Sequence, residues 1–447
     1  MPGVLELLPL DQLAMQRMLD IIRAEFERFG FLPIATPSLE LVEVLLTKTG
    51  GETERQVYLT QSSGSRARGY DPDLALRFDL TVPLARYVAE HEQDLVFPFR
   101  RYQIQPVFRG ESPQFGRYRE FIQCDIDVVG RDALSIRYDA EIPAVINAVF
   151  GRLDFGPFTI KINNRKVLRG LLEQAGVIAP HLQVLVLREV DKLERKGPEA
   201  VASALRALGI DAAGIDRLLT QAGGGLAQGA AIDERLESLG TGHPLLTEGV
   251  EELRQVFALI EAQRVPTSRY ALDLAIARGL DYYTGTVYET ALDDHPGLGS
   301  ICSGGRYDDL AGLYTTSRLP GVGISIGLTR LFAQLQNEGL VKPAASPVAA
   351  IVTLLDEAGL DHNLRIATLL RDAGINTEVV LEPARLGAQL KRADRAGIRL
   401  AVVIGEDERG RGSAIVRDLT TQTQETVPVD DLVKTIRQIL GNVDDRE

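Results

Sequence analysis

Apolar residues recur at three- and four-residue steps between residues 10 and 29. This spacing places them on one face of an α-helix, which Gly30 is well suited to end. The next stretch, residues 31–40, contains two prolines that bar a helix interior, so it is predicted to be extended. The helical stripe consists of Met15, Leu19, Ile22, Phe26 and Phe29.

Residues 98–130 hold two segments in which polar and apolar residues alternate, on either side of a loop rich in Gly and Pro. This pattern predicts a long antiparallel β-hairpin with one apolar face and one face dense in Arg, Gln and Asp. The pattern alone fits a solvated face as well as a binding surface. Gln and Arg, in place of Lys, Glu and Thr, favour fixed hydrogen-bond geometry. The polar positions are Arg101, Gln103, Gln105 and Arg109 on the first strand and Gln123, Asp125 and Asp127 on the second.

The rest of the chain divides into regions of different periodicity. Residues 76–89 predict a strand that runs into a helix, with Pro83 tolerated in its first turn. Residues 165–260 show helical periods joined by Gly-rich loops, which predicts a helical subdomain inserted between strand-rich regions. The segment 342–347, KPAASP, has the composition of a linker. After it, residues 348–440 alternate between strand and helix patterns and predict a compact α/β domain with a partly parallel sheet.

Composition narrows the class of protein. The chain has 447 residues, enough for about three domains, and is 45% apolar and 25% charged, as expected of a globular fold. The net charge of −13 means that any polyanion must bind to local Arg and Lys patches. Two distant cysteines exclude a disulfide scaffold or a Cys-rich zinc module and suit a reducing compartment. The acidic N-terminal stretch is not expected to be a signal peptide, and no apolar run approaches the length of a membrane span.

Two stretches carry candidate chemistry. The hairpin loop, residues 109–119, packs three arginines and one acid around a turn. Arginines in such a loop can hold a triphosphate, although a surface loop with incidental charge fits equally well. Residues 277–285 place Arg278 beside the adjacent phenols of Tyr282 and Tyr283 in an apolar context. Adjacent tyrosines are commonly shared between core and surface, so this stretch is a weaker candidate.

The glycines of residues 321–330 invite a dinucleotide-binding interpretation that their position argues against. They lie within a predicted strand and before a helix, with no β-α unit after them. The simpler prediction is a strand that runs into a helix starting with Arg330. The five histidines form no HExxH motif, which argues against a zinc hydrolase.

The longest motifs resemble those of the histidyl-tRNA synthetase family, within the class II aminoacyl-tRNA synthetases. The hairpin resembles motif 2 of that class, in the form seen in this family. The segment GFLPIATPSLE resembles motif 1, and GVGISIGLTR resembles motif 3. The segments ARGLDYYTGTVYET and SGGRYDDL resemble the two histidine-specific signatures. The terminal region, which contains KRADRAGIRLAVVIGEDE, resembles the family's anticodon-binding domain. The resemblance covers nearly the whole chain, in order.

The resemblance implies an α+β fold whose catalytic core is an antiparallel sheet flanked by helices. It also implies a homodimer in which the motif 1 segment packs against its symmetry mate. The expected parts are a core in two pieces, 1–160 and 261–335, a helical insertion over 161–260, a linker over 336–347 and an α/β anticodon-binding domain over 348–447.

Family roles carry over to matching positions of this chain. The resemblance assigns Asp79, Thr81 and Gln123 to the α-ammonium of histidine, and these acceptors suit a group with three donors. It assigns Asp127 and Tyr282 to the imidazole ring. The full set of histidine-binding residues that it implies is Asp79, Leu80, Thr81, Arg109, Gln123, Asp127, Arg278, Tyr282 and Tyr283.

The resemblance likewise implies residues for ATP and tRNA. Arg109 matches the motif 2 arginine at the α-phosphate and the substrate carboxylate, and Arg330 matches the motif 3 arginine at the γ-phosphate. Arg278 matches an arginine that takes the place of a metal at the α-phosphate, so Arg109 and Arg278 are the expected catalytic residues. Glu111 and Arg117 match further ATP contacts. The expected tRNA-binding residues are Gln114 in the hairpin loop and Arg385, Lys391, Arg392 and Arg395 in the terminal domain.

The chain departs from the commonest family pattern at four positions. Asp79 and Asp127 stand where many members carry Glu, which keeps the chemistry and alters the reach. Ser112 stands where many bacterial members carry an arginine that reads the tRNA acceptor end. Thr329 replaces the Glu that usually precedes the motif 3 arginine.

The implied activity is ATP-dependent formation of histidyl-adenylate, followed by transfer to the 3′ end of histidine tRNA in the cytoplasm. Mg²⁺ is expected on the ATP phosphates, with no protein-held metal, organic cofactor or membrane partner. One alternative is a non-catalytic, histidine-binding paralogue resembling the regulatory subunit of ATP phosphoribosyltransferase. Such paralogues usually lose catalytic arginines and the terminal domain, and this chain has Arg109, Arg278, Arg330 and a terminal domain. A second alternative is an RNA-binding pseudo-enzyme.

Overall fold

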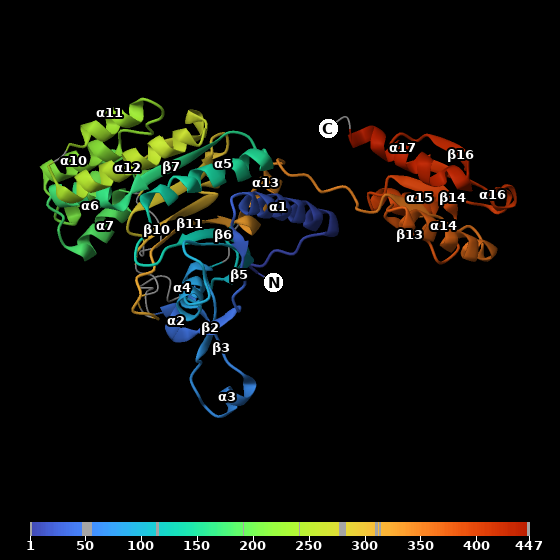
Figure 1. Ribbon diagram of the computed structural model, residues 1–447, viewed down its shortest axis with the longest axis horizontal. Coiled ribbons are helices and arrows are strands. Elements are labelled where there is room, and N and C mark those ends of the chain that lie inside the picture. The colour runs from blue at the N-terminus through green and yellow to red at the C-terminus, as the bar shows by residue number, and fades with distance from the viewer. Residues whose placement is uncertain are drawn as a thin grey trace. The chain divides into compact units, whose positions relative to one another are not determined.

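The computed structural model describes residues 2–46, 56–112, 116–190, 192–240, 242–276, 283–308, 312 and 314–444. Within this part the chain forms two compact units (Figure 1). The first comprises Met1–Glu6 and Met15–Lys342, and the second comprises Leu7–Ala14 and Pro343–Glu447. Each unit has its own main β-sheet.

An eight-stranded sheet, in the order β1-β5-β6-β11-β10-β9-β7-β8, forms the centre of the first unit. β1 pairs with β5 and β8 with β7 in parallel, and the other described neighbours run antiparallel. The predicted antiparallel core is therefore confirmed. The strands are β1 (Leu32–Pro33), β5 (Phe99–Phe108), β6 (Glu120–Val129), β7 (Phe158–Asn164), β8 (Tyr270–Leu272), β9 (Thr286–Leu292), β10 (Cys302–Tyr307) and β11 (Gly321–Gly327).

The predicted hairpin is confirmed as β5 and β6, which pair in register over ten residues each. The predicted N-terminal helix is α1 (Pro9–Arg28), and it covers the apolar face of the hairpin. The rings of Phe26 and Tyr102 lie 6.1 Å apart, and the Tyr102 hydroxyl donates to the Glu27 carboxylate at 2.8 Å. Because side chains alternate along a strand, the polar positions of the hairpin face away from α1.

A small antiparallel sheet and two helices lie around the polar face. Residues 76–89 form the end of β4 (Leu74–Leu76) and most of α4 (Thr81–Glu90), as predicted. After β11 comes α13 (Leu328–Asn337), which begins at Leu328 and not at Arg330, because Leu328 and Thr329 are buried helical residues. The small sheet has the order β2-β4-β3, with β2 (Leu39–Leu41) and β3 (Tyr58–Thr60), and is accompanied by α2 (Val42–Leu46) and α3 (Ser63–Ala67).

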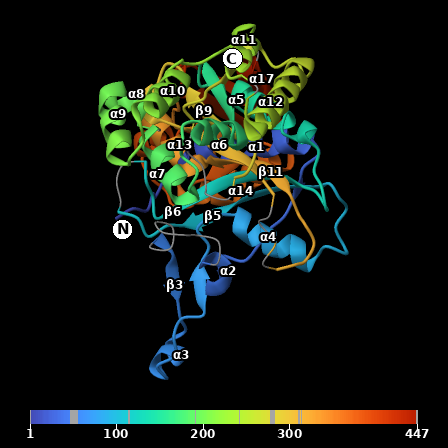
Figure 2. The ribbon, with the colours of Figure 1, turned by 90° about the vertical axis from the view of Figure 1, so that its left-hand side faces the viewer.

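Helices predominate between β7 and β8, at the opposite end of the first unit from the small sheet (Figures 1 and 2). α5 (Glu141–Leu153) precedes β7. α6 and α12 pack closely, since a Cβ on Gly170 would lie 2.8 Å from Leu246 atoms. The helices between the two strands are α6 (Arg165–Gln174), α7 (Pro180–Val190), α8 (Leu193–Lys196), α9 (Pro198–Ala207), α10 (Ala212–Ala222), α11 (Ala231–Ser238) and α12 (Pro244–Ala262). No helix among the described residues is both long enough and apolar enough to cross a membrane.

The second unit contains a five-stranded sheet in the order β13-β12-β14-β15-β16. β12 pairs in parallel with β13 and β14, whereas β15 and β16 are antiparallel, so the predicted partly parallel sheet is confirmed. The sequence pattern missed β16 and α16, which carry few buried residues. The elements are β12 (Ala350–Val352), α14 (Leu360–Asp372), β13 (Thr377–Val379), α15 (Leu386–Arg395), β14 (Leu400–Val403), α16 (Glu406–Arg411), β15 (Ser413–Asp418), β16 (Gln424–Pro428) and α17 (Leu432–Asp444).

Candidate active site

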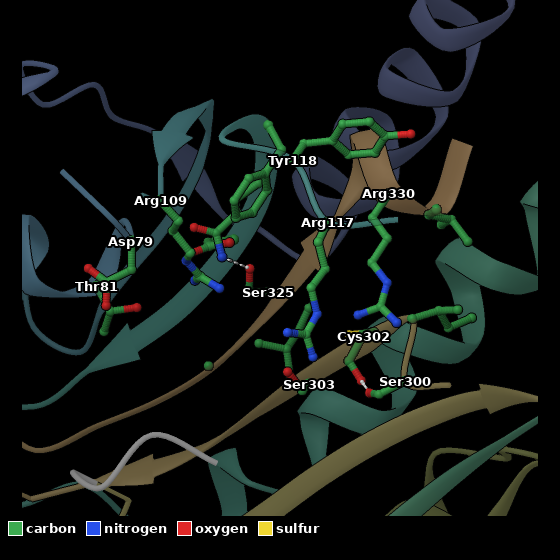
Figure 3. A pocket seen from close by; sticks show the side chains of 18 of the residues that line it. Asp79, Thr81, Arg109, Arg117, Tyr118, Ser300, Cys302, Ser303, Ser325 and Arg330 are labelled. Atoms are coloured by element: carbon green, nitrogen blue, oxygen red, sulfur yellow. Dashed lines mark hydrogen bonds between the residues drawn. The ribbon is translucent and has the colours of Figure 1, made fainter. Parts of the chain in front are cut away.

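A cavity of about 550 Å³ opens on the polar face of the hairpin, between β6, β10, β11, α4 and α13. Asp79 and Thr81 lie at one end, Arg117 and Arg330 at the other, and Arg109 and Ser325 between them (Figure 3). The cavity brings together nine of the predicted site residues: Asp79, Thr81, Arg109, Glu111, Arg117, Gln123, Asp127, Tyr283 and Arg330. Leu80, predicted with them, is fully buried and is not among the residues that line the cavity.

Two acceptor oxygens at the Asp79 end have no hydrogen-bond partner among the described residues. Asp79 uses Oδ1 to accept the Val82 amide at 3.1 Å, at the start of α4, and its buried Oδ2 is unpaired there. Gln123 donates from Nε2 to the Ser325 hydroxyl at 2.8 Å, and its buried Oε1 is likewise unpaired. Buried acceptors are normally satisfied, so this end of the cavity is suited to a ligand that donates several hydrogen bonds.

The carboxylate of Asp127 is held at both oxygens. The Tyr307 hydroxyl donates to Oδ1 at 3.0 Å, and Nη2 of Arg101 lies 2.5 Å from Oδ2. Gly323 stands opposite Asp127 on β11, and a Cβ there would lie 2.4 Å from Oδ1. Only glycine leaves room for the carboxylate at this point, which explains one of the glycines in the strand.

Asp79, Asp125 and Asp127, which we call the carboxylate wall, are all buried and line the cavity. Burial raises the pKa of Asp79 and of Asp127 to about 6 and the pKa of Asp125 to about 7, while the charge of Arg101 opposes all three increases. A carboxylate in a low-dielectric site is stabilised by a nearby positive charge. The wall is therefore suited to a cationic group.

Arginines dominate the rest of the cavity. Arg109 donates from Nε to the Phe78 carbonyl at 3.1 Å, and its guanidinium lies 5.0 Å from the centre of the Phe121 ring. Arg330 donates to the Leu298 carbonyl at 3.1 Å, and burial together with the charge of Arg117 lowers the pKa of Arg330. Arg117 forms an ion pair with Glu111 at 3.5 Å. Guanidinium groups in this arrangement are suited to phosphate oxygens.

Thr329 has a defined structural part in place of the expected glutamate. Its hydroxyl accepts the amide N–H of Ile122 at 2.9 Å and so joins the start of α13 to β6. The first turn of α13, which carries Arg330, is thereby fixed to the hairpin.

Family models match the chain over most of its length. The model described as histidyl-tRNA synthetase matches residues 3–331, and the model described as anticodon binding domain matches residues 349–439. The chain belongs to the histidyl-tRNA synthetase family. The resemblance that the sequence motifs carry is thus confirmed.

Individual members of the histidyl-tRNA synthetase family agree with this assignment. A protein named histidine–tRNA ligase from Xanthomonas axonopodis pv. citri (strain 306) is 56% identical over 98% of this chain and 95% of its own length. A protein of the same name from Xylella fastidiosa (strain M23) is also 56% identical, over 98% of this chain and 97% of its own. The crystal structure of histidyl-tRNA synthetase from Nostoc sp. PCC 7120 superposes with a TM-score of 0.86 at 39% identity, covering 98% of each chain, and confirms the predicted fold class.

Three residues with predicted roles in this family, Gln114, Arg278 and Tyr282, lie outside the described residues. Conversely, the cavity contains residues to which the sequence assigned no role, notably Tyr307, Ser325 and the carboxylate of Asp125. Alternation along β10 would have placed Tyr307 on one face with Ser303, which also lines the cavity. Sequence alone gives no sign that this face of β10 meets Asp127 from two strands away.

The basic residues predicted to bind tRNA lie on and just before α15. Arg385, Lys391, Arg392 and Arg395 are all exposed. Arg392 forms an ion pair with Glu378. Among the described residues, no group of three or more His, Cys, Asp or Glu side chains is placed to hold a metal ion.

Proposed function

We propose that this chain activates L-histidine with ATP, forming histidyl-adenylate and pyrophosphate, and then transfers the histidyl group to the 3′ end of histidine tRNA. The observation that carries the proposal is the cavity, in which unpaired acceptors and the carboxylate wall lie at one end and guanidinium groups at the other. A zwitterionic amino acid beside a triphosphate matches this distribution of charge. Family membership and the identity to proteins named histidine–tRNA ligase support the same conclusion.

The α-ammonium of histidine would bind at Asp79, Thr81 and Gln123. An ammonium group has three donors, and Oδ2 of Asp79 and Oε1 of Gln123 are buried acceptors with no partner among the described residues. The imidazole would bind at Asp127 and at Tyr282, which lies outside the described residues, with Tyr283 adjoining. A pocket with buried polar groups discriminates strongly, because an analogue without both ring nitrogens would leave those groups unpaired.

The reaction is an in-line attack of the histidine carboxylate on the α-phosphorus of ATP. Arg109 would hold the carboxylate and the α-phosphate, and Arg330 and Arg117 would hold the distal phosphates. These groups would position the reactants and neutralise developing charge, the main protein contributions to phosphoryl and nucleotidyl transfer. We assign Arg278 to the α-phosphate and Glu111 to ATP on the family pattern. Mg²⁺ would enter with ATP as part of the substrate.

Recognition of the tRNA would divide between the cavity and the second unit. Gln114 would contact the acceptor end, and the exposed cations of α15 would contact the anticodon arm. Removing residues 345–447 should spare histidine-dependent pyrophosphate exchange and reduce aminoacylation by about 10²–10³-fold, because a linked second binding site contributes affinity of that order. A truncated protein that charges tRNA normally would contradict the assignment of the terminal domain.

The working unit in the cytoplasm would be a homodimer. Leu32, Leu39 and Leu41, at and just after the motif 1 segment, are 65%, 46% and 41% exposed. Such apolar surface is typical of an interface. Sedimentation at micromolar concentration tests this: an active species near 48.9 kDa would contradict the dimer, and one near twice that mass would support it.

Histidine-dependent exchange of pyrophosphate into ATP is the direct test of the proposed reaction. A histidine-binding regulatory paralogue and an RNA-binding pseudo-enzyme would both fail it. Exchange that proceeds equally with other amino acids would contradict the assignment of histidine as substrate. Exchange without aminoacylation of histidine tRNA would contradict the second step.

A further inference from the structure

Arg101 is a completely buried arginine beside the cavity. It lies on β5, directly opposite Asp127 on β6, and has no exposed surface. It is not among the residues that line the cavity, whereas Asp127 is. A guanidinium without access to water is costly unless it compensates a charge nearby. Its position behind the wall indicates a role exerted through Asp127.

The two contacts of Asp127 determine which of its electron pairs remain available. Tyr307 and Arg101 each occupy one side of the carboxylate, at 3.0 Å from Oδ1 and 2.5 Å from Oδ2. Each carboxylate oxygen has two lone-pair sites, so both oxygens can still accept a further hydrogen bond. A carboxylate fixed from both sides cannot rotate freely, and its remaining acceptor directions are set by the protein.

Other polar groups of this cluster are incompletely paired. All three guanidinium nitrogens of Arg101, Oε1 of Gln103 and Oδ1 of Asp125 are buried and have no hydrogen-bond partner among the described residues, so the contact of Nη2 with Asp127 is an ion pair without hydrogen-bond geometry. Unpaired polar atoms concentrate at this point of the hairpin, beside a cavity. Of these residues only Asp125 lines the cavity, so a polar ligand there can pair its Oδ1, whereas Arg101 acts on the wall through its charge.

The charged groups around Asp127 come from several elements. Arg101 lies on β5, Tyr307 on β10, Asp125 on β6 itself, and Asp79 just before α4. Three further electrostatic interactions surround them: Arg109 with Asp79, Tyr283 with Tyr307, and Arg77 with Asp125. The charge of Arg101 lowers the pKa of all three carboxylates of the wall, against burial, which raises them. Arg101 is the main compensating group for Asp125 and Asp127, whereas the Val82 amide and Arg109 contribute more than Arg101 at Asp79.

We propose that Arg101 is a positioning residue for histidine, which keeps the Asp127 carboxylate ionised and oriented so that it accepts a ring N–H of the substrate. The inference rests on the proposed function. Arg101 itself does not touch the substrate. Its effect is confined to the use of histidine, because the arginines assigned to ATP have their own anchors at Phe78 and Leu298.

A dependence on pH follows from this role. Without Arg101 the pKa of Asp127 rises further above its present value of about 6. A protonated carboxyl cannot accept at that oxygen, so the variant should bind histidine poorly near neutral pH and recover as pH rises. Titration of the substrate imidazole changes the KM of all variants by the same factor, so it cancels in the ratio of variant to wild-type KM.

The experiment compares pyrophosphate exchange by the wild type and Arg101→Met between about pH 6 and pH 9. We expect the KM for histidine to rise about 10- to 100-fold near neutral pH, because the buried carboxylate of Asp127 loses its compensating charge, and the ratio to fall toward high pH. The KM for ATP should remain within about 2-fold. A ratio that is constant with pH, or an equal effect on ATP, would overturn the inference.

Arg100→Met is the matched control. Arg100 is the neighbouring arginine on β5, points to the other face and forms an ion pair with Glu141 at 2.8 Å. It should leave both KM values unchanged, so a histidine defect there equal to that of Arg101→Met would overturn the inference. If Arg101→Met does not fold, Arg101→Lys keeps the charge and loses the fork; an unchanged KM for histidine in that variant would also count against it. A wild type without histidine-dependent exchange would refute the proposed function itself, which distinguishes the two failures.

Discussion

Two buried aspartates, Asp125 in the first unit and Asp418 in the second, show how partners decide what a carboxylate does. Both lie on β-strands and are nearly inaccessible, 1% and 4% exposed. Asp418 is paired with Arg399 at 2.9 Å and accepts the amide N–H of Thr420 at 2.8 Å. Asp125 has the hydroxyl of Ser325 beside it, and its Oδ1 has no partner among the described residues.

The pKa values of the two aspartates are therefore shifted in opposite directions. Although burial raises the pKa of Asp418, the contacts with Arg399 and with two backbone amides outweigh it, and the net pKa is lowered. Asp418 therefore stabilises the fold above the ordinary pKa, and this stabilisation is lost as pH falls through the lowered value. Burial raises the pKa of Asp125 to about 7, so its ionisation destabilises the fold as pH rises from about 4 toward 7. A buried carboxylate with a complete set of partners stabilises the fold, whereas one with an incomplete set remains available to bind a ligand.

The largest expected effect tests the cavity side of this comparison. Arg109→Ala should reduce histidine-dependent exchange by about 10²–10³-fold, the usual cost of removing a preorganised charge contact to the transition state. Arg131→Ala, which removes an arginine paired with Glu92 at 3.0 Å, should leave the rate unchanged. Nearly normal exchange by a folded Arg109→Ala protein would remove Arg109 from the reaction.

Asp127→Asn tests whether the carboxylate wall is specific for histidine. The amide offers donors where the carboxylate only accepts, so the KM for histidine should rise about 10- to 100-fold while the KM for ATP changes little. Steady-state exchange with each substrate varied in turn measures both. An equal effect on the two substrates would place Asp127 outside the imidazole pocket.

The double variant Lys391→Ala/Arg395→Ala tests the second unit. These exposed cations lie four residues apart on α15 and should contribute sequence-independent attraction to tRNA. We expect the KM for tRNA to rise about 10-fold and the dependence of aminoacylation on salt to weaken, with exchange unchanged. Lys434→Ala, a lysine on α17, is a control of the same charge type. An unchanged salt dependence would show that α15 is a solvated surface.

The smallest effect sharpens the comparison of the two aspartates. At pH 8, Asp125→Asn should stabilise the ligand-free first unit by about 1 kcal/mol, because it removes a charge whose burial is incompletely compensated, and the gain should shrink as pH falls and vanish near pH 4. Asp418→Asn should destabilise the second unit at pH 8 and have less effect in acid. Scanning calorimetry at both pH values measures the two changes. Opposite signs are required; a common sign would remove the distinction.

Much of this protein is determined by the sequence alone. The helical stripe of α1, the alternation in β5 and β6, and the strand–helix alternation of the second unit all follow from local periodicity, because each element must bury one face. The family motifs also gave nine residues that meet in one cavity. Local patterns missed β16, whose residues are mostly exposed, and misplaced the start of α13, since helix ends depend on caps and burial more than on periodicity.

Only the tertiary structure decided whether the polar face of the hairpin is a solvated surface or a buried binding site. Its alternation fits a solvated surface equally well, yet Arg101, Gln103 and Asp125 are at most 1% exposed. Residues more than a hundred positions away close over this face: Ser325 and Gly323 on β11 lie against β6, and Tyr307 on β10 reaches Asp127. Pairing between distant strands is set by packing of the whole sheet, which no local pattern contains. That packing removes water from the carboxylates, raises their pKa values and turns a polar strand face into a site for a charged ligand.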